Sequence, residues 1–396
     1  MKNKRKVLKN KSVLLCVTGS VAAYKAIDVI RRLRDEGASV TVIMTAAAKQ
    51  FITSLSLEIA SQNKVYSDLF SDPMAHITLP AQADIMVIAP ATANTIGKFA
   101  GGIADNLLST CLLSFSGKIV IAPAMNWRMY ENPVFQKNLN YLLSRGVFQV
   151  GPEKGSLACG EDGIGRMSDV SEIIEAIKSA LSKKNLAKEK IIVTAGPTRE
   201  YLDPVRFISN RSSGKMGYAL ARAALRKGAE VTLISGHSLL SQPKGVKFIS
   251  VETASDMLNA VNQELPSSTV LIMSAAVSDF MPEEKAKEKI EKSGELTVKL
   301  QKTPDIISEI SKNKNRPFII GFAAETGGKI DRARKKLKEK NMDMIIFNDV
   351  AKADSGFDVD TNRVVIIDKE KEISLPLMSK DSVADAILER LSEIKA

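Results

Sequence analysis

The chain has 396 residues, of which 44% are hydrophobic and 26% charged, and its formal net charge at pH 7 is +11. This length suggests two or three domains, and the composition is that of a globular protein with ample core. No apolar run approaches the roughly 20 residues that a membrane helix needs, and no signal-peptide cleavage pattern follows the basic stretch 1–11.

The excess of positive charge indicates either nucleic-acid binding or a lysine-rich surface that attracts small anions. Basic residues are spread along the chain, with one local cluster at 331–340, and aromatic residues make up only 5%. We therefore expect small anionic ligands and neither a nucleic-acid nor a membrane partner. Cys16, Cys111 and Cys159 have no metal-ligand spacing and cannot pair fully, so we expect a cytoplasmic protein with free thiols.

In the first half of the chain, strand and helix signals alternate, which is typical of parallel α/β architecture. The pattern predicts strands at 12–18, 39–44, 84–89 and 118–122, and helices at 22–35 and 171–182. The charged segment 183–190 has no apolar period and is the best candidate for a linker. The predicted organisation is a basic tail (1–11), a first domain (12–186) and a second domain (190–396).

After the linker the alternation restarts, so the predicted fold is α/β with two doubly wound parallel-sheet domains. The expected elements are a helix at 216–227 and strands at 191–196, 229–236, 269–274, 317–322, 343–347 and 363–368. The segment 281–303 is charged and lacks a regular apolar period. It predicts a long functional loop or a mobile hairpin.

Ligands of open α/β sheets bind beyond the carboxyl ends of the strands, and three features of the first half meet this condition. Thr18-Gly19-Ser20 follows the first strand and opens a helix, which suits a phosphate group. Thr45 follows the second strand. The small residues of 89–94, with Thr92 and Asn94, let a flat ring approach the backbone. Each feature alone is commonly a simple turn, but together they predict a cofactor site.

Three further residues of the first half carry possible chemistry. His76 lies in the segment MAHITLP, predicted as a loop, and a lone histidine is more often structural than catalytic. Asn126 directly follows a predicted strand in PAMNWRMYENP, and Cys159 lies in SLACGEDGIGRM, which is typical of a glycine-rich flap. A cysteine on such a flap is a plausible proton donor. His237, the other histidine, receives no role.

The second half contains FISNRSSGKMGYALARAAL at 207–225, where small residues and a lysine run into a helix. This is the pattern of a phosphate-binding turn. It is not a P-loop, because Met216 stands where that motif requires Ser or Thr and Ser209 replaces its first glycine. Ser212, Ser213 and Gly214 would instead offer hydroxyl and backbone donors to phosphate.

These motifs resemble a known family. GSVAAYK, AHITL, PATANT, PAMN and LACGEDGIGRM are similar to the flavin-containing cysteine decarboxylases. With the second half included, residues from about 12 to 390 resemble the bacterial bifunctional enzymes of coenzyme A biosynthesis. In that family, phosphopantothenoylcysteine decarboxylase is fused to phosphopantothenate–cysteine ligase. The resemblance implies a flavodoxin-like domain followed by a Rossmann-like one.

For the first domain, the resemblance implies an FMN-dependent decarboxylase. An α-carboxylate departs only if its electrons have a sink, and oxidation of the substrate thiol to a thioaldehyde creates one. The resemblance assigns His76 to this half-reaction, Asn126 to the substrate carboxylate and Cys159 to protonation of the enethiolate. It also implies a trimer-based homo-oligomer, compatible with a dodecamer, in which His76 acts on a neighbour's flavin. The implied FMN contacts are Gly19, Ser20, Thr45, Thr92 and Asn94.

For the second domain, the resemblance implies that CTP activates 4′-phosphopantothenate as an acyl-cytidylate, which cysteine then attacks. It assigns Asn210 and Lys289 to this chemistry and Asp279 to the nucleotide and a Mg²⁺ ion. Because Glu291 stands where relatives often have a basic residue, Lys287 and Lys292 remain alternatives to Lys289. The implied CTP contacts are Ser212, Ser213, Gly214, Met273, Ser274, Ala275, Asp279, Lys289, Pro304, Asp305, Ile306, Ile307, Phe322, Lys336 and Lys340.

Two other functions stay open at this point. A single-function flavin-dependent cysteine decarboxylase would not need the complete second half. A non-catalytic flavoprotein-like binding subunit would not need His76, Asn126 and Cys159 together.

Overall fold

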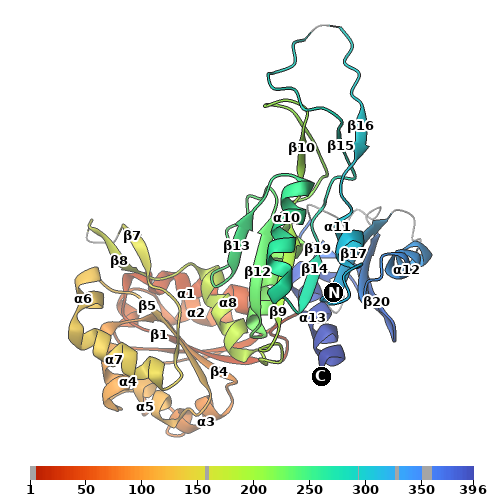
Figure 1. Cartoon of the computed structure of the whole chain (residues 1–396). Helices are drawn as coiled ribbons and strands as arrows, with labels where there is room; N and C mark the ends of the chain where they lie inside the picture. Colours follow the sequence, from red (N-terminus) through yellow and green to blue (C-terminus); the bar gives the residue numbers. More distant parts are fainter. Residues whose placement is uncertain (1–5, 157–159, 293, 326–329, 350–358) are drawn as a thin grey trace. The chain divides into compact units, whose positions relative to one another are not determined.

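The computed structural model describes residues 6–156, 160–292, 294–325, 330–349 and 359–396. They form two compact units, residues 6–182 and residues 183–396, which are described separately (Figure 1). Each unit is built on a largely parallel sheet with helices on both faces, so the predicted α/β class is confirmed.

The first unit contains a six-stranded parallel sheet with the strand order β3-β2-β1-β4-β5-β6. Both faces are covered by helices, so the strands are nearly continuous apolar runs, and every residue of β4 is buried. The predicted strands at 12–18, 39–44, 84–89 and 118–122 are confirmed within two residues, whereas the short β3 and β6 were not predicted. The strands are β1 (Ser12–Val17), β2 (Ser39–Met44), β3 (Val65–Tyr66), β4 (Ile85–Ala91), β5 (Lys118–Pro123) and β6 (Phe148–Gln149).

Helices cover the two faces of this sheet through separate apolar cores. The first face carries α1 (Ala26–Asp35), α2 (Ser54–Ser61) and α8 (Val170–Leu181). The second face carries α3 (Ala75–Ala81), α4 (Ala93–Gly101), α5 (Leu107–Ser114) and α7 (Pro133–Ser144). The helix predicted at 22–35 begins as a 3-10 turn, η1 (Val21–Lys25). Residues 6–11, predicted as part of a basic tail, are packed on this unit through Leu8, which is buried.

His76 was predicted in a loop, and this is wrong, because it lies in α3. The segment was misread because it contains Pro80, which cannot donate a backbone hydrogen bond to the residue four positions earlier. That residue is His76, and its carbonyl instead accepts a hydrogen bond of 2.7 Å from Ser114 Oγ of α5. A tertiary contact therefore replaces the missing helical bond.

The second unit contains an eight-stranded sheet with the order β13-β12-β9-β14-β17-β18-β20-β21. All six predicted strands are present, but β20 and β21 are antiparallel, which was not predicted. Residues 369–371 are too few for the crossover that a parallel pair needs. The strands are β9 (Lys190–Ala195), β12 (Glu230–Ser235), β13 (Lys247–Ser250), β14 (Val270–Met273), β17 (Phe318–Glu325), β18 (Met344–Asp349), β20 (Val364–Asp368) and β21 (Glu372–Ser374).

The helices of this unit also divide between two faces. One face carries α9 (Lys215–Arg226), the predicted helix, and α13 (Lys380–Lys395). The other carries α10 (Ala254–Glu264), α11 (Ile306–Ile310) and α12 (Ile330–Glu339). A buried ion pair between Arg390 of α13 and Asp368 of β20, with atoms 2.7 Å apart, ties the last helix to the sheet.

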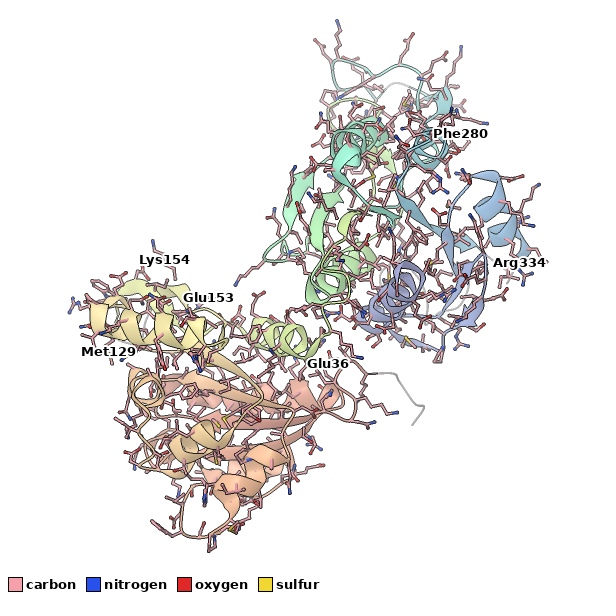
Figure 2. All side chains as sticks on the ribbon, turned by 60° about the horizontal axis from the view of Figure 1, so that its bottom comes forward. Glu36, Met129, Glu153, Lys154, Phe280 and Arg334 are labelled. Carbon is pink, nitrogen blue, oxygen red and sulfur yellow. The ribbon has the colours of Figure 1, made fainter. Side chains whose placement is uncertain are left out.

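Residues 280–292 and 294–302 form a projecting arm (Figure 1), whose base is an antiparallel pair of β15 (Phe280–Pro282) and β16 (Leu300–Lys302). A second antiparallel pair, β10 (Arg199–Tyr201) and β11 (Phe207–Ser209), lies beside it. Phe280, labelled in Figure 2, begins the arm. Of the two predicted alternatives, a long functional loop or a mobile hairpin, the β15–β16 pair favours a hairpin.

Across the parts of the chain that the structure describes, no helix combines the length and the apolar character needed to cross a bilayer.

Candidate active sites

The first unit contains a cavity of about 680 Å³ at the carboxyl ends of β1, β2 and β4, here called the N-terminal cavity. This is the edge of the sheet at which ligands of such folds bind. The lining includes all five predicted FMN contacts, namely Gly19, Ser20, Thr45, Thr92 and Asn94. The structure thus gathers residues from three separate strand ends around one space.

Hydrogen bonds fix the turn that opens this cavity. Thr18 Oγ1 donates to the carbonyl of Pro90 at 2.7 Å and accepts from the backbone N–H of Thr92 at 3.2 Å. Gly19 is required by close packing, because a Cβ there would lie 2.5 Å from that of Ala47. The turn is therefore held rigidly before η1, where Ser20 is the N-cap.

The walls of the N-terminal cavity are almost uncharged. Among the described residues, Lys98 is the one charged member of the lining, and its Nζ lies 2.5 Å from an oxygen of Asp105. Apolar side chains such as Met44, Phe51 and Met125 complete the lining. Such a cavity suits a planar ring with a polar tail, because neutral donors fix the tail while apolar contacts hold the ring.

Asn126 lies beside this cavity, between Met125 and the N-terminus of α6 (Trp127–Glu131), whose Met129 also lines it. Its side chain is the N-cap of α6 and accepts from the backbone N–H of Arg128 at 2.9 Å. The side chain that sequence analysis assigned to a carboxylate is therefore held in one orientation, next in the chain to the lining residue Met125.

A hairpin of β7 (Glu153–Ser156) and β8 (Asp162–Arg166) packs against α6. Glu153 and Lys154 of the hairpin and Met129 of α6 lie on one side of the unit (Figure 2). A Cβ at Gly165 would lie 2.1 Å from the carbonyl oxygen of Met125. The hairpin is the predicted glycine-rich flap, and its glycines permit this close approach. Cys159 itself lies outside the described residues.

Neither His76 nor Asn126 belongs to the described lining of the N-terminal cavity. Cys16 and Cys111 are buried. Burial raises the pKa of the Cys111 thiol to about 12, and burial, followed by the nearby Cys111, raises the pKa of Cys16. These two thiols are therefore inert core residues.

The second unit contains a cavity of about 620 Å³ at the carboxyl ends of β14, β17 and β18, here called the C-terminal cavity. Most predicted CTP contacts line it, together with Asn210, which was assigned to the acyl intermediate. Ser213, Lys289 and Lys336 do not belong to its described lining. The predicted residues that line it are Asn210, Ser212, Gly214, Met273, Ser274, Ala275, Asp279, Pro304, Asp305, Ile306, Ile307, Phe322 and Lys340.

Local geometry explains why the phosphate-like turn takes this form. Gly214 has a φ of +77°, a left-handed conformation that favours glycine, and it is the N-cap of α9. A Cβ at Gly217 would lie 2.5 Å from that of Ala195 and 2.8 Å from Ser274 Oγ. Both glycines thus let the start of α9 lie directly against the strand ends, with its N–H groups toward the cavity.

Two other polar groups are fixed at the walls. Asn210 Nδ2 donates to the carbonyl of Val277 at 2.8 Å. Asp305 caps α11 and lies 2.9 Å from Lys340 Nζ. Burial alone would raise the pKa of Asp305, but hydrogen bonds from Lys340 and Ser308 lower it. The described residues contain no cluster of three acidic, histidine or cysteine side chains for a metal.

Sequence analysis missed several polar residues of this cavity. Asn348 and Asn362 belong to segments that received no role from their sequence. Lys380 gave no sequence signal, because it is the first residue of the last helix and far from every motif. The polar lining residues that were not predicted are Arg211, Lys302, Asn348, Asn362 and Lys380.

Lys289 lies in the arm, and the next residue, Ile290, is held by hydrogen bonds to its backbone. The buried carboxylate of Asp203 accepts from the backbone N–H of Ile290 at 3.2 Å and from those of Val205 and Arg206 at 2.7 Å. Arg206 also donates to the carbonyl of Ile290 at 3.0 Å. Burial would raise the pKa of Asp203, but these backbone donors and Arg206 lower it to about 2.

Comparison with known proteins gives two consecutive family matches. Residues 1–182 match the Flavoprotein family, and residues 186–394 match the "DNA/pantothenate metabolism flavoprotein C-terminal domain". The chain is 45% identical over 395 residues to the "Coenzyme A biosynthesis bifunctional protein CoaBC" of Vibrio cholerae, covering 98% of this chain and 99% of the relative. Proteins of the same name from Bacillus subtilis (98% of each chain) and Escherichia coli (97% of each chain) are 42% and 44% identical.

Proposed function

This chain belongs to the family of bifunctional coenzyme A biosynthesis proteins, and from that premise we propose that it makes 4′-phosphopantetheine in two steps. It joins 4′-phosphopantothenate to cysteine, and it then decarboxylates the product. The observation that carries both activities is the presence, in one chain, of two separate cavities at the carboxyl ends of two parallel sheets. The alternatives with one activity or none leave the C-terminal cavity without a purpose.

We propose the N-terminal cavity as the FMN site, because its rigid turn, neutral donors and apolar wall fit a flavin. When bound, FMN supplies oxidation of the substrate thiol and later returns a hydride. Asn126 holds the substrate carboxylate until CO₂ departs. Cys159 donates the proton to the enethiolate.

His76 serves the same reaction from a neighbouring subunit in this proposal. Two observations support that arrangement. His76 is absent from the described lining of its own cavity, and two apolar side chains near it are exposed, namely Met74, the N-cap of its helix, and Ile77. A trimer-based homo-oligomer would cover such residues and deliver the imidazole to the next cavity.

We propose the C-terminal cavity as the ligase site, with CTP as the activating nucleotide. The turn before α9 receives phosphate, and Asp279 would hold a Mg²⁺ ion, which would supply positive charge against the anionic nucleotide. Asn210 contacts the acyl-cytidylate and takes part in its reaction with cysteine. Lys289 assists formation of that intermediate from the arm, whose anchoring by Asp203 supports a defined position. Phosphorylated substrates and free thiols support a cytoplasmic location.

The test is a mass-spectrometric product assay on the purified full chain with 4′-phosphopantothenate, cysteine, Mg²⁺ and either CTP or ATP. We expect 4′-phosphopantetheine and CMP in the CTP sample alone. Accumulation of 4′-phosphopantothenoylcysteine would contradict the flavin half, and absence of turnover with both nucleotides would contradict the ligase half.

A Lys289→Gln variant sharpens the assay. We expect it to lose acyl-cytidylate formation while still decarboxylating supplied 4′-phosphopantothenoylcysteine. Lys287→Gln is the matched control from the same loop. If ligation survives in the first variant and fails in the second, the catalytic lysine is Lys287.

A further inference from the structure

Segment 125–128 of the first unit packs against one face of the strand β8. A Cβ at Gly165 would lie 2.1 Å from the carbonyl oxygen of Met125, and one at Gly163 would lie 2.6 Å from the Cβ of Trp127. The backbone N–H of Met125 also donates to the carbonyl of Gly165 at 3.0 Å. Alternate residues of a strand share a face, so both glycines belong to the face that meets this segment.

Glu161, two residues before Gly163, continues this alternation and contacts the same segment through its side chain. Its Oε2 accepts from Nε1 of Trp127 at 2.8 Å, and its Oε1 accepts from Nη2 of Arg128 at 2.7 Å. Those two side chains also stack, with the guanidinium carbon 5.2 Å from the centroid of the ring. One carboxylate, which can only accept when ionised, therefore holds both side chains that follow Asn126.

Arg128 in turn orients Asn126. Its backbone N–H donates to Oδ1 of Asn126 at 2.9 Å, so the amide nitrogen is the group of that side chain that can donate to a carboxylate. Met125 and Met129, on either side of this pair in the chain, line the N-terminal cavity. The direction of the Asn126 amide therefore depends on the segment that Glu161 holds.

We propose that Glu161 is a positioning residue that orients Asn126 toward the substrate carboxylate by holding the two residues that follow Asn126. The inference rests on the proposed decarboxylase function and deepens it, because it adds a residue by which the site distinguishes its carboxylated substrate from the decarboxylated product. Glu161 forms no bond to the substrate. If the amide turns, the carboxylate loses its donor, whereas the contacts of the rest of the substrate remain.

Two compounds that differ only in the carboxylate separate this role from a general effect on the hairpin. The first is the amide of 4′-phosphopantothenate with serine, which keeps the carboxylate but has no thiol to oxidise. The second is the amide with ethanolamine, which lacks the carboxylate as well. Their affinities for the flavin-loaded full chain are measured from the change in flavin absorbance, which reports on the N-terminal cavity.

We expect Glu161→Ala to weaken binding of the serine amide by about 10-fold, the factor that a lost hydrogen bond to a charged group produces, with binding of the ethanolamine amide unchanged. Glu161→Gln should restore part of this affinity, because its amide oxygen still accepts from Trp127. Trp127→Phe keeps an aromatic ring without the donor and should weaken binding of the serine amide by a smaller factor. Glu153→Gln is the matched control, because that carboxylate belongs to the same hairpin (Figure 2) but pairs with Arg166 of the hairpin itself, 3.1 Å away.

The two amides also define the results that would overturn the inference. Weaker binding of both compounds to Glu161→Ala would show a general role in the hairpin, and unchanged binding of both would show no role. Equal weakening in Glu153→Gln, or equal affinity of the wild-type chain for the two amides, would also overturn it. A preference for the serine amide that depends on Glu161, in a chain that releases no CO₂ from 4′-phosphopantothenoylcysteine, would support the inference and refute the decarboxylase function.

Discussion

The two cavities of this chain use the same position in similar sheets but differ in their chemistry. Among the described residues, the N-terminal cavity has a single charged lining residue, Lys98, whereas seven charged residues line the C-terminal cavity, five of them cationic. A cavity that retains a cofactor obtains most of its binding affinity from shape and neutral hydrogen-bond donors. A cavity that takes anionic substrates from solution obtains affinity from positive charge, which also raises the association rate.

The largest expected effect concerns the flap. Cys159→Ser should lower formation of 4′-phosphopantetheine by about 100- to 10,000-fold, the range for loss of a general acid, because the enethiolate is no longer protonated. Ligation should continue, since its cavity belongs to the other unit. Mass spectrometry of the products follows both. Equal loss of the two activities would contradict the division of labour between the units.

The next largest effect comes from a substitution that changes the shape of the N-terminal cavity alone. In Gly19→Ala the new methyl group would lie 2.5 Å from Ala47 Cβ, so the turn must shift. We expect flavin affinity to fall by about 10- to 100-fold, in line with the cost of overpacking, measured by flavin fluorescence titration. Gly97→Ala is the matched control, because its nearest neighbour is 3.8 Å away. Unchanged flavin affinity in Gly19→Ala would contradict the inference that a rigid turn at Gly19 is needed for flavin binding.

A smaller effect concerns the anchor of the arm. Asp203→Asn should reduce kcat of ligation about 10-fold, the factor that a lost hydrogen bond to a charged group produces, with flavin binding unchanged. Asp331→Asn, an exposed acid on α12, is the control. A change in flavin binding, or an equal decrease of kcat in Asp331→Asn, would contradict the inference that Asp203 acts on ligation by positioning Lys289.

The same anchor gives a pH dependence. Because folding lowers the pKa of Asp203 to about 2, its stabilising contribution is complete above the unfolded pKa of about 3.9. It is lost as pH falls from about 4 toward 2. Urea unfolding of the wild-type chain and Asp203→Asn should therefore differ at pH 7 and converge near pH 2. An equal difference in the free energy of unfolding at both pH values would show that the charge of the Asp203 carboxylate does not contribute to stability.

The smallest expected effect compares the cavities directly through ionic strength. Raising salt from about 0.02 to 0.2 M shortens the Debye length from roughly 20 to 7 Å. The KM for CTP should rise several-fold, while the dissociation constant of the flavin should change by less than twofold. Equal salt dependence of the two constants would contradict the contrast between a charged and a neutral cavity.

The alternation of strands and helices could be predicted from the sequence, and so could the glycine-containing turns at 18–20 and 212–214. Part of the lining of each cavity could be predicted as well. These features are local, because strand ends and glycine turns are encoded by neighbouring residues. The helix around His76 escaped prediction, since Pro80 suggests a break and only Ser114, distant in sequence, supplies the missing hydrogen bond.

Tertiary structure alone decided the rest. Lys380 lies beside Lys215 because α13 returns to pack against α9 on one face of the sheet, a contact that no local pattern encodes. Likewise, Ile290 of the charged arm is held by the buried carboxylate of Asp203, from a turn far earlier in the chain. Side chains widely separated in sequence become neighbours only when the apolar faces of helices and sheet are buried together. The sites therefore depend on packing as well as on motifs.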